Sequence, residues 1–118
     1  MFTNKLENAV NGVQGGIAAI LMGFDGIPVD SFVADSDFDI ETIGMEFSVV
    51  LRDVMKAAEQ LEAGSTEEFT VRTEKMSTVL RIVNPNYFLA MSLSSDGNVG
   101  KAKYLLRVLA PDLVKDLD

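Results

Sequence analysis

The sequence predicts an α+β fold, namely a single five-stranded antiparallel sheet with helices on both faces. Short apolar or alternating segments separated by turn residues occupy residues 17–33 and 68–93, which is typical of strands joined by hairpins. Apolar residues at steps of three and four indicate helices at residues 3–13, 40–61 and 102–117. The predicted element order is therefore α-β-β-α-β-β-β-α, and we expect residues 1–118 to form one domain.

Composition limits the functions that the chain can have. It contains no cysteine and no histidine, which excludes thiolate chemistry and removes the commonest general base and transition-metal ligand. The net charge is −8, and such a chain is repelled by nucleic-acid phosphates and by anionic lipid. We expect a soluble, cytoplasmic protein that binds neither nucleic acid nor membrane, since its first residues do not resemble a signal peptide and no segment is long enough to span a bilayer.

The first part of the chain predicts a helix followed by a hairpin. Thr3 or Asn4 can cap the helix, and Gly12 with the pair Gly15-Gly16 ends it. A glycine-rich turn can also hold phosphate, but only when a strand precedes it and a helix follows, which is the reverse of the order here. The apolar run 17–22 predicts a buried strand, and the turn Phe24-Asp25-Gly26 leads into strand 27–33. Pro28 lacks an N–H donor, so we expect this second strand to be an edge.

The helix at 40–61 is the element around which the chain is organised. Its predicted core stripe consists of Ile40, Ile43, Phe47, Val50, Leu51, Val54, Ala58 and Leu61. Met45 and Val49 form a second, narrower apolar stripe on the opposite side, with Arg52 and Lys56 in line with it. We interpret the first stripe as the contact with the sheet and the second as a contact with another protein.

The acidic segment 35–39 precedes this helix. Its spacing resembles a calcium loop, but Ile40 occupies the position where such a loop needs glycine. Carboxylates that cap the helix N-terminus are the better interpretation, and Gly64 is the expected C-cap.

Three further strands are expected at 68–74, 76–83 and 87–93, joined by short turns. Placing the apolar strand 17–22 in the centre gives the strand order second, first, fifth, fourth, third. Strand 68–74 is then the other edge, and neither proline nor a bulge protects it from pairing with another chain. Its Thr70, Val71 and Arg72 lie where antiparallel pairing with a second copy would be centred. The segment Ser95-Asp96-Gly97-Asn98 is expected to close the sheet and cap the final helix, and Pro111 to kink or restart that helix.

These segments resemble the roadblock/dynein light chain family, and in particular its stand-alone bacterial members of the MglB type. The resemblance covers essentially the whole chain and is carried by "GGIAAILMGFDGIPVDSFV" at 15–33, the acidic lead into the long helix, and "SSDGNVGKAKYLLRVLAP" at 94–111. Its more specific parts are Asp25-Gly26 with Pro28, and Asn98 with Gly100. These residues build the fold and are not catalytic.

The resemblance implies a dimer in which edge strands pair and the central helices lie side by side. It also implies binding of a Ras-like small GTPase of the MglA type, whose GTP hydrolysis MglB-type proteins stimulate by remodelling the GTPase and not by inserting an arginine. The expected interface residues of a homodimer or GTPase complex are Met45, Val49, Arg52, Lys56, Thr70, Val71 and Arg72.

Two other functions fit the sequence. The first is a dimeric scaffold, or an adaptor like a dynein light chain, that has no effect on GTP turnover. The second is an enzyme or small-molecule sensor with a pocket beneath the central helix. The expected walls of that pocket are Ile, Val, Leu and Phe, so we expect no catalytic residue, cofactor, metal or small-molecule substrate.

Overall fold

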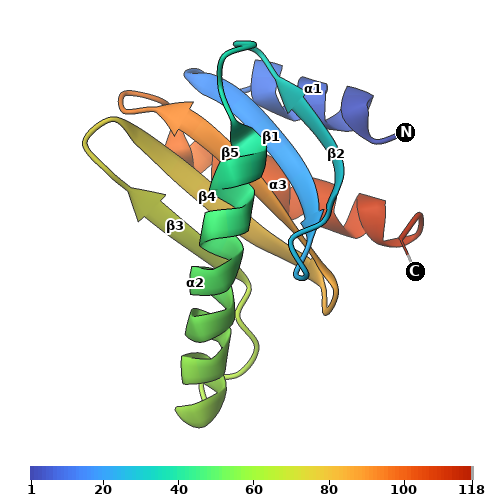
Figure 1. Ribbon diagram of the computed structural model, residues 1–118, viewed down its shortest axis with the longest axis vertical. Helices are drawn as coiled ribbons and strands as arrows, with labels where there is room; N and C mark the ends of the chain where they lie inside the picture. The colour runs from blue at the N-terminus through green and yellow to red at the C-terminus, as the bar shows by residue number, and fades with distance from the viewer. Residues whose placement is uncertain (118) are drawn as a thin grey trace.

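The computed structural model describes residues 1–117, which form one five-stranded antiparallel sheet and three helices in the predicted order (Figure 1). The elements are α1 (Thr3–Asn11), β1 (Gly16–Gly23), β2 (Pro28–Val33), α2 (Ile40–Gln60), β3 (Glu68–Arg72), β4 (Met76–Asn84), β5 (Tyr87–Ser94) and α3 (Val99–Val114). Within residues 1–117, no helix has both the length and the apolar character needed to cross a membrane.

The strand order is β2-β1-β5-β4-β3, which confirms the predicted topology with β1 inside the sheet and β2 and β3 at its edges. Residues 18–23 of β1 are buried, as expected for a strand covered on both faces. Pro28 pairs with Met22 beside a shift in the β1–β2 register, so the proline lies where the ladder is already irregular.

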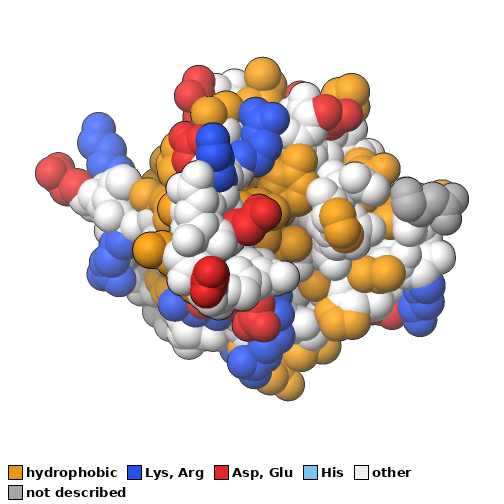
Figure 2. All heavy atoms as spheres, turned by 90° about the horizontal axis from the view of Figure 1, so that it is seen from below, with side chains coloured by type: hydrophobic (Ala, Val, Ile, Leu, Met, Phe, Trp, Pro, Cys, Tyr) orange, Lys and Arg blue, Asp and Glu red, His pale blue; other side chains and the backbone are white. Residues whose placement is uncertain are grey.

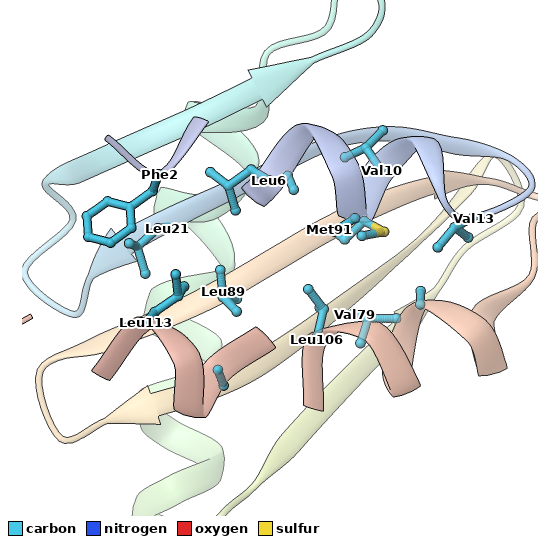
Figure 3. Packing of buried hydrophobic residues seen from close by; sticks show 14 of the residues in the cluster. Phe2, Leu6, Val10, Val13, Leu21, Val79, Leu89, Met91, Leu106 and Leu113 are labelled. Atoms are coloured by element: carbon cyan, nitrogen blue, oxygen red, sulfur yellow. The ribbon is translucent and has the colours of Figure 1, made fainter. Parts of the chain in front are cut away.

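Helices cover both faces of the sheet, as predicted. Helices α1 and α3 pack on one face, where Leu6 and Leu106 meet sheet residues such as Leu21 and Met91 (Figure 3). Helix α2 packs on the other face against a second cluster that includes Ile20, Leu80 and Phe88.

The helix ends differ in part from the expectations. Phe2 occupies the N-cap position of α1 and makes no side-chain cap bond, so the prediction of Thr3 or Asn4 was wrong. Asp39 and Asn98 do cap α2 and α3, accepting hydrogen bonds from the amides of Thr42 and Lys101. Each lies in a segment, 35–39 or 95–98, that was predicted to cap the helix after it.

The prediction that Gly64 caps α2 was wrong. Helix α2 ends at Gln60, before Gly64, and Glu62 rather than a glycine takes the left-handed conformation that ends it, with φ of 57°. Helix α3 continues through Pro111, which lies on its exposed side, so the helix does not restart there.

Candidate protein-interaction surface

Helix α2 approaches the sheet closely only through its first turns. The buried residues of α2 are Ile40, Gly44, Ser48 and Leu51, which recur at steps of three and four. A Cβ added at Gly44 would lie 3.0 Å from the Cε atom of Met22, so the absence of a side chain lets the helix sit directly on β1. Small residues therefore set the contact between helix and sheet.

The second half of α2 extends beyond the edge of the sheet, as Figure 1 shows. Val50 is 42% exposed and Leu61 is 78% exposed, so their assignment to the core stripe was wrong. Val54, Met55 and Ala58 are only partly buried. The cause is geometric, because a helix that crosses a sheet obliquely leaves its last turns with little sheet beneath them. This half of α2 offers apolar side chains that the rest of residues 1–117 does not cover.

The outward stripe of α2 lies where the sequence placed it. Met45 is 53% exposed and Val49 is 52% exposed, and the exposed Arg52 and Lys56 fall within an arc of roughly 60° with them. Figure 2, which looks toward the projecting end of α2, shows hydrophobic side chains exposed among charged ones of both signs. An isolated pair of exposed apolar residues is common on protein surfaces, and the use of this stripe as an interface is a proposal.

Strand β3 has a free edge. The Thr73 amide donates to the Met76 carbonyl and the Ile82 amide donates to the Glu67 carbonyl, at 2.8 and 3.1 Å. In an antiparallel ladder only every second residue hydrogen-bonds to the neighbouring strand. The backbone N–H and C=O groups of the odd-numbered residues of β3 therefore point toward β4. The N–H and C=O groups of Glu68, Thr70 and Arg72 therefore point away from the sheet.

The side chains of β3 are partly engaged within the chain. The Glu68 carboxylate forms two ion pairs: its Oε1 lies 3.8 Å from Nη1 of Arg81, and its Oε2 lies 3.5 Å from Nζ of Lys103. A guanidinium nitrogen of Arg72 donates to the Ser95 carbonyl at 3.3 Å. The Thr70 hydroxyl is different, because it is buried and has no hydrogen-bond partner among the described residues.

The structure places the predicted interface residues in two groups on neighbouring elements. Met45, Val49, Arg52 and Lys56 share the outward side of α2, whereas Thr70, Val71 and Arg72 lie along the β3 edge. The two elements meet on the inner side of α2, where Leu51 and Met55 belong to the same cluster as Phe69.

A cavity of about 690 Å³ lies beneath the projecting end of α2. The sequence predicted apolar walls of Ile, Val, Leu and Phe at this place, and this was wrong in part. Met55 and Ile82 do line the cavity, but so do Glu59, Glu62 and Thr66. Sequence reasoning missed these residues because the helix ends early and the following segment folds back beneath it. These polar residues belong to the last turn of α2 and to the loop that follows it, and we assign no ligand to them.

Comparison with known proteins agrees with this architecture. MglC from Myxococcus xanthus is similar over 98% of both chains, with 43% sequence identity and a TM-score of 0.71. The roadblock/LC7 domain from Streptomyces avermitilis has a TM-score of 0.86 at 15% identity, covering 96% of this chain and 94% of its own. Two MglB structures, the gliding protein of Thermus thermophilus and one with a tetrameric arrangement, each have 16% identity and a TM-score of 0.83 over 95% of this chain and 84% of theirs. No protein-family model and no curated protein sequence matches the chain.

Proposed function

Because the chain belongs to the roadblock/LC7 family, we propose that it is a homodimeric regulatory adaptor that docks a Ras-like small GTPase of the MglA type. In this proposal residues 1–118 are one roadblock domain with no catalytic residue, cofactor or metal of its own. The observation that carries the proposal is the combination of a free β3 edge with an exposed apolar stripe on α2. Edge strands with unpaired backbone groups are templates for pairing with another chain.

The β3 edge favours one register of self-pairing. Only the even-numbered residues of β3 have free backbone groups, so they must pair with even-numbered residues of the second copy. With Thr70 on the two-fold axis, Glu68 lies opposite the partner's Arg72, so opposite charges are paired. In this register the backbone groups of Glu68, Thr70 and Arg72 all form hydrogen bonds with the second copy. A register shifted by one residue per chain puts Glu68 opposite the partner's Glu74, which is unfavourable.

Thr70 supports this register independently. Its buried hydroxyl has no partner within residues 1–117, and buried polar groups are normally satisfied. On the two-fold axis it lies beside the partner's Thr70, and threonine pairs across strands can hydrogen-bond to each other. The second copy therefore supplies what a single copy lacks.

The outward stripe of α2 is the proposed docking surface for the second subunit's helix and for the GTPase. Met45 and Val49 provide the apolar centre, and Arg52 and Lys56 the charged rim, which is the usual division of an interface. We do not propose Arg52 or Arg72 as a catalytic arginine finger. Arg72 already donates a hydrogen bond to the Ser95 carbonyl, and Arg52 belongs to the docking rim.

A scaffold without effect on GTP turnover is the second candidate. Identity is 43% with MglC but only 16% with MglB, and a similarity at the lower level extends to the fold alone. Stimulation of hydrolysis therefore does not follow from the resemblance to MglB.

The test is co-elution of this chain with a purified MglA-type GTPase on a sizing column, combined with the rate of GTP hydrolysis. Co-elution supports the adaptor, and the rate then separates an activator from a scaffold. A dimer that does not bind the GTPase, either with GDP or with a GTP analogue, would overturn docking of the GTPase. A monomer at micromolar concentration would overturn the dimer.

A further inference from the structure

The two edge strands of the sheet differ in how open they are to a further strand. Strand β3 pairs with β4 in one unbroken register from Glu68 to Arg72. Strand β2 lies at the opposite edge, beside the start of α1 (Figure 1), and its register with β1 is interrupted. Because an open edge invites pairing with another chain, this difference decides which copies of the chain can join.

The first half of β2 is poorly suited to continue a ladder. Pro28 has no N–H group to donate. The pairing with β1 also shifts, because Leu21 pairs with Asp30 but Met22 pairs with Pro28, so that Val29 is an extra residue on β2. Such a β-bulge bends and twists an edge strand, and both a proline and a bulge discourage another strand from pairing.

The second half of β2 is closed by a side chain. The Ala34 amide donates to the Ile17 carbonyl at 2.8 Å, and bonded residues alternate along the strand, so the Ser31 amide points out of the sheet. Oδ1 of Asp30 accepts a hydrogen bond from this amide at 2.9 Å. An incoming strand would bring a carbonyl oxygen to an amide that is already bonded, next to a carboxylate that repels the oxygen.

The Asp30 carboxylate is held in this position by the start of the chain. It accepts the Thr3 hydroxyl at 2.6 Å and the Phe2 amide at 2.9 Å, and it lies 3.4 Å from the terminal amino group of Met1. Its side chain is only 22% exposed. Because these donors converge on the carboxylate, a strand that displaced it from the Ser31 amide would also have to break the attachment of α1.

The edge that Asp30 closes has apolar side chains beside it. Ile27 is 64% exposed and Val29 is 42% exposed. An edge strand that is both open and apolar is a site of association with other chains. Closure of the backbone therefore matters more at β2 than it would at a polar edge.

We propose that Asp30 closes the β2 edge, so that copies of this chain join through β3 and not through β2. This inference rests on the proposed function for the β3 dimer and adds what limits its size. A β3–β3 contact is isologous and closes at two copies. If β2 were also open, each dimer would add further copies through its two outer edges and the sheet would extend without limit.

An opened-edge variant tests the proposal. Asp30→Thr removes the carboxylate and leaves a good strand former, and Pro28→Val in the same chain restores the missing N–H. We expect the mass measured by sedimentation to rise at least about twofold above that of the wild type as concentration is raised. Adding Thr70→Pro should reduce the assembly to two copies or fewer, because each chain then has only one edge that can pair.

The matched control is Thr3→Val, which removes the same 2.6 Å hydrogen bond at the start of α1 but leaves the carboxylate on the Ser31 amide. We expect its mass to equal that of the wild type. Equal growth of Thr3→Val and the opened-edge variant would assign the effect to a loosened α1 and overturn the proposal. Growth that Thr70→Pro does not limit, or a wild type that itself grows beyond two copies, would also overturn it.

A measurement on the wild type does not depend on how well the variants fold. The amides of Ser31 and Val33 both point out of β2, but Asp30 accepts only that of Ser31. We expect the Ser31 amide to exchange with solvent at least about tenfold more slowly than the Val33 amide, measured by NMR. Equal exchange rates would overturn the closure by Asp30.

Failure of this proposal can be told from failure of the proposed function. A wild type that is monomeric would overturn the β3 dimer, whereas the opened-edge variant should then still form pairs through β2. An opened-edge variant that is folded by circular dichroism and keeps the mass of the wild type would overturn the role of Asp30, whether the wild type is a monomer or a dimer.

Discussion

The Thr3 hydroxyl donates a 2.6 Å hydrogen bond to the carboxylate of Asp30, and this bond fastens the start of α1 to the edge strand β2. The same carboxylate accepts the amide of Phe2 at 2.9 Å. Asp30 thus satisfies backbone at the N-terminus of α1, where helices have free N–H groups and where negative charge is favourable. Asp30, 27 positions from Thr3, thus takes the role at the start of α1 that the sequence analysis assigned to a cap from Thr3 or Asn4.

Replacing Asp30 with asparagine should destabilise the protein in a pH-dependent way. The hydrogen bond from Thr3, with those from the amides of Ser31 and Phe2, lowers the pKa of Asp30. A lowered pKa stabilises the folded state fully above the pKa of the unfolded chain, about 3.9, and this contribution is lost as pH falls through the folded value. We expect Asp30→Asn to cost about 1–2 kcal/mol at pH 7 in urea unfolding, and the difference from wild type to shrink below about pH 4.

The control for this prediction is Asp53→Asn, at an exposed position of α2. That variant should change the free energy of unfolding by less than about 0.5 kcal/mol at pH 7. A cost for Asp30→Asn that does not depend on pH between 7 and 3 would show that the carboxylate charge is not what fastens α1.

Replacing Glu62 with glycine should stabilise the protein. Glu62 has φ of 57°, and the Ala63 amide bonds back to the Ala58 carbonyl at 2.9 Å, so the residue ends α2 in the left-handed conformation that glycine prefers. We expect a gain of about 0.5–1 kcal/mol, seen as a higher urea midpoint at constant m-value. Glu59→Gly, within the last turns of α2, should instead cost about 1 kcal/mol. Equal effects of the two substitutions would contradict the assignment of the helix end.

The sheet topology could be predicted because each strand carries a strong local signal. The fully apolar run at 17–22 had to be central, and Pro28 had to be at an edge, which leaves few alternatives. The caps from Asp39 and Asn98 were predictable for the same reason, since each is a local contact within three residues.

The inner face of α2 could not be predicted correctly from hydrophobic spacing. Hydrophobicity assigned Val50 and Leu61 to the core, whereas the structure buries Gly44 and Ser48. Small residues contribute little to a hydrophobic pattern, yet they decide where a helix can approach a sheet most closely. The overhang of α2 depends on the crossing angle, which the sequence alone does not specify.

Replacing Val49 with aspartate tests the outward stripe of α2. Val49 is half-exposed in a single subunit, so a carboxylate there should leave the fold and its urea midpoint nearly unchanged. In the proposed interface the charge would be desolvated, and we expect the dimer or the GTPase complex to weaken at least tenfold by sedimentation and co-elution. Asp53→Asn is again the control. An unchanged mass together with unchanged GTPase binding would remove the stripe from the proposal.

Replacing Thr70 with proline tests the β3 edge most directly. The Thr70 amide points away from β4, so proline removes no bond of the chain's own sheet, but in the two-fold register it removes both bonds that join the two Thr70 residues. We expect a folded monomer at concentrations where the wild type is a dimer, measured by sedimentation and circular dichroism. Val33→Pro is the matched control on β2, because the Ala34 amide bonds to Ile17 and the Val33 amide therefore also points outward. A dimer that persists in Thr70→Pro but dissociates in Val33→Pro would place the subunit contact at the opposite edge of the sheet.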